Sequence, residues 1–103
     1  MIIDDGAKLY IYWDATLTFD PTTSTVQLQI NNTYYAMAWQ STPVYSGGKW
    51  RQTAKTTQLF GGSLADATNT PVLLGKGRFL GEPTVTIGSQ IVPCISTIEI
   101  DIY

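Results

Sequence analysis

The side chains that usually perform catalysis are scarce in this 103-residue chain. Histidine is absent, so the group that most often transfers protons near neutral pH is missing. The single cysteine, Cys94, follows Pro93 in an apolar stretch, which favours a small buried side chain over a reactive thiol. A two-carboxylate glycosidase needs only a suitably spaced pair of acids, but turns are where acids ordinarily face solvent. Four acids fall in predicted turns: Asp14, Asp20, Asp66 and Glu82. We therefore expect a protein that is not an enzyme and uses no cofactor.

Metal and phosphate sites are also not indicated. Glu99 and Asp101 share one face of a predicted strand and could hold a cation together, but an outward polar face is the expected explanation. The glycine-rich segment 75–79 begins like a phosphate loop, yet it lacks the Gly-Lys-Ser/Thr ending and no helix is predicted to follow it. Its glycines indicate a bulge or a close backbone approach.

The charge and the apolar pattern of the chain argue against proteins that bind nucleic acid, span a membrane or are secreted. Six basic against eight acidic residues give a net charge of −2, which supplies no basic surface for nucleic acid. No apolar run approaches the ~20 residues needed to cross a bilayer, and the acidic start lacks the features of a secretion signal. We expect a complete small product made in the cytoplasm. Only 14% of the residues are charged, which favours a subunit whose surface is largely covered by partners.

Alternation of polar and apolar residues predicts β-strands almost throughout. The segments 25–30 and 96–103 alternate without a miss, and each should bury one face. The residues expected inward on these segments are Val26, Leu28, Ile30, Ile98, Ile100 and Ile102. In all, strands are expected near 8–13, 15–19, 25–30, 34–40, 49–60, 71–80, 83–87 and 91–102, with a bulge or bend at Asp14 between the first two.

Turn chemistry separates these strands. The segment 20–24 begins Asp-Pro, where proline fixes φ and Asp20 can bond back to the chain. The pair Asn31-Asn32 suits a hairpin turn, because asparagine tolerates positive φ. Further breaks are expected at 47–48, 61–62, 81–83 and 88–89, and only 63–70 could hold a helical turn.

Seven or eight short strands with frequent turns predict an all-β fold, an antiparallel β-sandwich formed by a single domain over 1–103. Trp39 stands where an immunoglobulin-like sandwich often places a core tryptophan, so the architecture is expected to be Ig-like. A small closed β-barrel is the alternative.

The most distinctive feature of this sequence is its content of aromatic residues, which make up 12% of the chain. Trp13 shares the inward phase of the first strand with Leu9 and Ile11, and Trp39 and Phe19 also fit inward phases. Other aromatics are expected on outward faces or in loops, where they offer rigid contact area with a polar tip. The interface or ligand candidates are Tyr10, Tyr12, Tyr34, Tyr45 and Trp50.

Part of the chain resembles small β-rich proteins of tailed bacteriophages. The resemblance covers residues 14–62 and rests on ATLTFDP at 15–21, the alternating strand 25–30, AWQ at 38–40, GGKWRQTAKTT at 47–57 and FGG at 60–62. It implies a virion component made in the host cytoplasm, such as a capsid decoration protein, a minor capsid protein or a small tail protein. Its partners would be other virion proteins in a repeated lattice, further copies of itself and host glycans.

Two other functions remain open from the residues. A carbohydrate-binding module would stack sugar rings on the exposed aromatics and bond their hydroxyls through asparagine and glutamine. A homo-oligomeric interaction domain of cellular origin is the third candidate. No catalytic, cofactor or metal residue is expected in any of the three.

Overall fold

The computed structural model describes residues 1–4, 6–63, 71–93 and 96–103. These residues form β-strands joined by turns, and none of them belongs to a helix. In the part described, therefore, no helix could span a membrane. The possible helical turn at 63–70 falls almost wholly outside the described residues, as does Cys94.

Most of the strands belong to one nine-stranded sheet with the order β1-β12-β10-β4-β5-β7-β3, while β11 also pairs with β10 and β6 with β7. Its strands are β1 (Ile2–Ile3), β3 (Tyr12–Leu17), β4 (Thr25–Ile30), β5 (Thr33–Trp39), β6 (Val44–Ser46), β7 (Lys49–Thr56), β10 (Gly77–Ile87), β11 (Gln90–Pro93) and β12 (Ile98–Ile102). Every neighbouring pair is antiparallel except β1 and β12.

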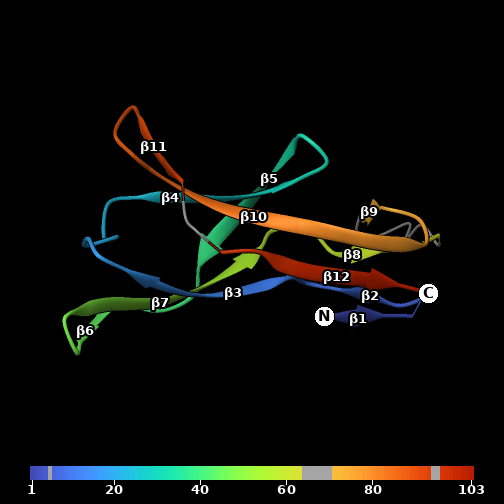
Figure 1. Ribbon diagram of the computed structural model, residues 1–103, viewed down its shortest axis with the longest axis horizontal. Coiled ribbons are helices and arrows are strands. Elements are labelled where there is room, and N and C mark those ends of the chain that lie inside the picture. Colours follow the sequence, from blue (N-terminus) through green and yellow to red (C-terminus); the bar gives the residue numbers. More distant parts are fainter. Residues whose placement is uncertain (5, 64–70, 94–95) are drawn as a thin grey trace.

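The long sheet folds over itself into two layers. Figure 1 shows β4 and β10 in one layer, β3 and β7 in the other, and β5 running between the two. A sheet with one apolar face gains most by turning that face onto itself, because two sheets that pack face to face remove both from water. The predicted all-β sandwich architecture is thus confirmed.

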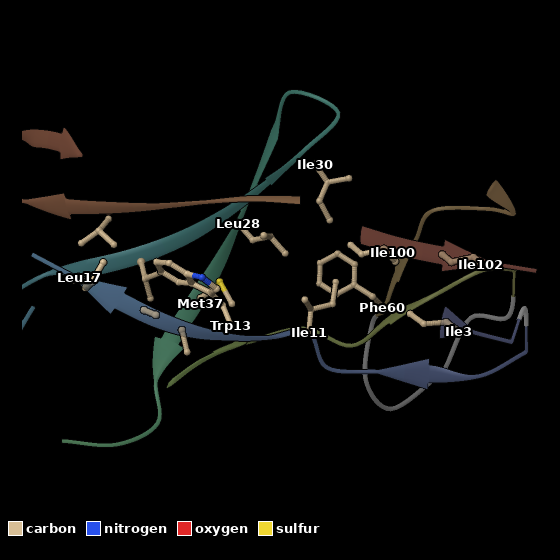
Figure 2. Close-up of a cluster of buried hydrophobic side chains, with 14 residues drawn as sticks. Ile3, Ile11, Trp13, Leu17, Leu28, Ile30, Met37, Phe60, Ile100 and Ile102 are labelled. Carbon is tan, nitrogen blue, oxygen red and sulfur yellow. The ribbon is translucent and has the colours of Figure 1, made fainter. Parts of the chain in front are cut away.

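The core lies between the layers and follows the predicted alternation. Val26, Leu28 and Ile30 are buried, as are Ile100 and Ile102, while Ile98 is half-buried and packs against the core. Figure 2 shows side chains from both layers meeting, with Leu28 from β4 above Trp13 and Leu17 from β3. The core also includes Ile3, Ile11, Ala15, Met37, Ala54, Phe60 and Val85.

A second, three-stranded sheet closes one end of this core. It consists of β2 (Lys8–Leu9), β8 (Phe60–Gly61) and β9 (Val72–Leu73). Phe60 is fully buried, and its ring meets that of Tyr35 edge to face at 5.0 Å. Figure 2 places it among Ile11, Ile100 and Ile3. The small sheet therefore supplies the aromatic side chain that fills the space beyond β3.

The break in the first predicted strand is in a different place from the one expected. Asp14 lies inside β3, opposite Thr53 of β7, so the predicted bulge there is wrong. Its carboxylate accepts a hydrogen bond of 2.9 Å from the Thr53 hydroxyl, which suits an outward position on an uninterrupted strand. The chain instead leaves β2 for β3 at Tyr10 and Ile11, and Leu9, expected inward, is 44% exposed in the small sheet.

The expected break at 81–83 is also wrong, because β10 runs through it from Gly77 to Ile87. Pro83 cannot donate a ladder hydrogen bond. Among the described residues, the pairing of β10 with β12 ends at Gly81 and that with β11 begins at Thr84, so Pro83 stands between the two ladders. The strand tolerates proline because one of its sides is unpaired there.

The turns predicted at 20–24, 31–32, 47–48 and 88–89 are confirmed. The break expected at 61–62 is not, because Gly61 belongs to β8, and the expected strands 49–60 and 71–80 are each divided in two. Asn31 and Asn32 connect β4 to β5 with φ of 50° and 65°, the left-handed conformation of a two-residue hairpin. Asp20 bonds back to the Thr22 backbone N–H at 3.0 Å, as its position after Phe19 and before Pro21 suggested. These turns fix which residues of neighbouring strands lie opposite each other.

Gly61 is required by a close approach of two backbones. A Cβ at this position would lie 2.8 Å from the Ala7 carbonyl oxygen, whereas the atom nearest to one at Gly81 would be a methyl carbon of the Leu28 side chain, at 2.9 Å. We expect Gly61→Ala to lower the free energy of unfolding by about 1–3 kcal/mol and Gly81→Ala by less, because the end of a leucine side chain can shift more easily than a backbone carbonyl. Urea unfolding followed by tryptophan fluorescence measures both, and equal stability of Gly61→Ala and the parent would contradict the packing described.

Thr56 connects β7 to the start of β3 through a buried hydroxyl. Its Oγ1 accepts the Ile11 N–H at 3.0 Å and donates to the Gln58 carbonyl at 2.9 Å. Thr56→Val keeps the shape but leaves both backbone groups unpaired, so we expect a loss of about 1–3 kcal/mol. Thr56→Ser keeps the hydroxyl and should cost less in the same urea assay; the reverse order would show that packing, not hydrogen bonding, matters here.

Candidate functional site

The five predicted aromatic candidates lie on two faces of the main sheet. Tyr12 stands opposite Lys55, and Lys55 stands opposite Ala38, so Tyr12 is on the outer face that also carries Tyr34. Tyr45 is opposite Trp50, which in turn is opposite the buried Leu17, so these two aromatics extend the inner face. The five side chains therefore do not form a single platform.

The inner-face pair is built by the β6–β7 hairpin. Gly47 and Gly48 have φ of 61° and 76°, which allows a tight two-residue turn and puts Tyr45 directly across from Trp50. The two rings lie 5.1 Å apart at an angle of 54°. Trp50 is half-buried and packs against the core, whereas Tyr45 is 62% exposed. The hairpin thus exposes the ring of Tyr45, which rests on a Trp50 ring that is itself packed against the core.

The position of this hairpin makes it accessible. The molecule is elongated, with extents of 41 × 25 × 23 Å. Figure 1, in which the longest axis is horizontal, shows the β6–β7 turn at one end and the C-terminus at the other. We use the term aromatic hairpin for Tyr45 and Trp50 together with the turn that joins β6 to β7. It is well placed to contact another macromolecule end-on.

Tyr10 has a partner within the chain. The Lys55 ammonium lies 4.3 Å from the centre of the Tyr10 ring, a cation–π contact that also places Tyr10 on the outer face, with Tyr12. Tyr10 is half-buried, while Tyr12 is 56% exposed. Tyr10 therefore stabilises the outer face, and Tyr12 is the more accessible of the two.

A hollow on the outer face is a site that the sequence did not reveal. It has a volume of about 300 Å³ and is lined by Gln29, Asn31, Asn32, Leu80 and Glu82. Glu82 stands opposite Gln29, which stands opposite Tyr34 on the other side, so these three side chains form a row across β10, β4 and β5. The turn at Asn31-Asn32 was the only signal in the sequence, and it indicated a hairpin rather than a binding site.

Charges near this hollow are mainly acidic. Leu80 pairs with Glu99 across the β10–β12 ladder, and Asp101 accepts a hydrogen bond of 2.9 Å from the Nε of Arg78. This bond, with the charges of Asp101 and Glu99, raises the pKa of Arg78 above its usual value. Glu99 and Asp101 share an outward face as predicted. Within the part of the chain that is described, no group of three or more acids, histidines or cysteines could hold a metal ion.

No protein-family model, curated protein or solved structure matches the chain. What these surfaces can bind is therefore inferred from the residues on them and from how those residues are arranged. Paired aromatics on a rigid hairpin suit contact with a protein, because they bury area with little loss of side-chain freedom. Amide side chains around a hollow suit a ligand that both donates and accepts hydrogen bonds.

The two rings of the aromatic hairpin should differ in their effect on stability. Trp50→Ala removes a half-buried side chain that packs on the core and should cost about 2 kcal/mol. Tyr45→Ala loses only an exposed cross-strand contact and should cost less than about 1 kcal/mol. Urea unfolding of the two variants checks this order; a larger loss for Tyr45→Ala would mean that Tyr45 is part of the core.

Proposed function

We propose that this chain is a structural subunit of a tailed bacteriophage particle, a capsid decoration protein, a minor capsid protein or a small tail protein. The observation that carries the proposal is the aromatic hairpin, where Tyr45 is exposed above the better-buried Trp50 at one end of an elongated β-sandwich. The resemblance of residues 14–62 to small phage proteins supports the same function. In this role the chain binds the assembled lattice in preference to the free shell protein, and so stabilises the assembly.

The hairpin has the properties of an interface anchor. Tyrosine and tryptophan dominate binding energy at protein interfaces, especially where one aromatic is supported by packing beneath it. Trp50 is held by the inner face of β7, so Tyr45 loses little freedom on binding. With only 14% charged residues in the chain, contact with another protein also requires little desolvation of charge.

Contacts between copies have a separate candidate surface. β3 is the last strand at one end of the main sheet, so its outer side has no neighbour in the described ladder. An uncovered strand edge can accept a strand from another chain. Neighbouring copies on a lattice would pair through this edge while each holds the particle through its hairpin.

Two measurements test the proposal. Mass spectrometry of purified particles of the phage that encodes the chain should detect it in many copies. Particles prepared without the protein should then bind the purified chain, and Tyr45→Ala should weaken that binding at least about tenfold, since a supported aromatic anchor contributes about 2 kcal/mol or more.

Tyr12→Ala is the matched control for this experiment. It removes a tyrosine of similar exposure, 56% against 62%, from the opposite face of the sheet. Binding should stay within about twofold of the parent, because pairing through the β3 edge would use its backbone groups and not this outward side chain. Absence of the protein from particles would refute the function, and equal losses for both variants would refute the role of the hairpin.

A further inference from the structure

The hollow beside the β4–β5 turn carries an inference that does not depend on a phage origin. Its lining combines three neutral amides, one carboxylate and one half-exposed leucine: Gln29, Asn31, Asn32, Glu82 and Leu80. Each amide offers both N–H donors and a carbonyl acceptor. Such a set matches a ligand whose hydroxyl groups also donate and accept.

The shape of the hollow limits the size of that ligand. Its volume of about 300 Å³ is at the lower end of the range for small-molecule sites, which leaves room for a single small ring. Tyr34 is 50% exposed and stands directly opposite Gln29 on the same face, so an apolar ring face is available next to the polar groups. A sugar ring has this dual character, with apolar C–H surface on its faces and hydroxyls around its edge.

The charges around the hollow limit the class of sugar. Of the described residues that line it, Glu82 alone is charged, and Glu99 stands opposite Leu80 in the adjoining ladder. Among the described residues neither lysine nor arginine lines the hollow, and the nearby Arg78 is already paired with Asp101, so an anionic sugar would meet repulsion without a free cation to compensate it. A neutral sugar avoids this cost and can donate a hydroxyl hydrogen bond to the Glu82 carboxylate.

The backbone holds these groups in place before any ligand binds. Asn31 and Asn32 form a tight turn in the left-handed region, and Gln29 and Glu82 are paired residues of two central strands. A site on paired strands loses little conformational freedom on binding. We propose that this hollow binds one ring of a neutral saccharide, with the amides and Glu82 on its hydroxyls and Tyr34 against its face.

The experiment is an NMR titration of the full chain, labelled with nitrogen-15, against the methyl glycosides of glucose, galactose, mannose and N-acetylglucosamine, with glucuronic acid as the anionic comparison. We expect saturable shifts for at least one neutral sugar at millimolar concentrations. These shifts should be confined to the backbone amides of the lining residues and to the side-chain amides of Gln29, Asn31 and Asn32. Glucuronic acid should bind at least about tenfold more weakly because it meets Glu82.

Variants separate the site from general effects on the fold. Gln29→Ala and Asn32→Gly should each weaken binding about tenfold, the loss expected for one good hydrogen bond to a ligand. Glycine at 32 keeps the positive φ of the turn while removing the amide. Gln27→Ala is the matched control, because Gln27 lies on the same strand and face but outside the hollow, and it should bind like the parent.

Three outcomes would overturn the proposal. These are the absence of saturable shifts with all four neutral sugars, shifts that map away from the hollow, and an equal loss of binding in Gln27→Ala and Gln29→Ala. The particle-binding experiment stays independent of these results, since it depends on Tyr45 at the β6–β7 hairpin. The two proposals can therefore fail separately.

Discussion

The structure depends on one constraint: a single sheet with one apolar face has to cover that face with itself. The chain meets it by letting β5 run between the layers, so that β4 and β10 lie across from β3 and β7. The covering is not complete. The inner face continues along β7 beyond the shared core to Trp50, and across the ladder to Tyr45, where exposure rises to 62%. The aromatic hairpin is thus a direct consequence of how the sheet folds over.

Much of the fold could be predicted because alternation reports which side chains of a strand are buried. Val26, Leu28 and Ile30 were identified on this basis, and their turn at Asn31-Asn32 followed from residue chemistry alone. The alternation within one strand does not show which other strand pairs with it. This is why the junction at Tyr10 and Ile11, where pairing passes from the small sheet to the large one, was placed at Asp14 instead.

The surfaces were harder to predict than the core for a related reason. Exposure of Tyr12 and Tyr34 follows from strand phase, whereas Tyr45 lies in β6, where no strand was predicted. The division of these tyrosines between two faces needs the register of β3, β7 and β6. To predict the hollow, the pairing of strands that are distant in the sequence must also be known. Gln29 and Glu82 are far apart in the sequence and meet only through the β4–β10 ladder, and a Gly-Glu-Pro segment read locally indicates a turn. Local patterns cannot show a site whose two halves are joined by non-local pairing.

The separation of the two surfaces allows both to be occupied together. The aromatic hairpin is on the inner face at the β6–β7 end, whereas the hollow is on the outer face beside the β4–β5 turn. Figure 1 shows these two turns well apart. Contact through Tyr45 would therefore leave the lining of the hollow open to solvent. A subunit attached to a particle by its hairpin would thus present its sugar site outward, in as many copies as the lattice binds, and weak single-site affinity would be multiplied by that repetition.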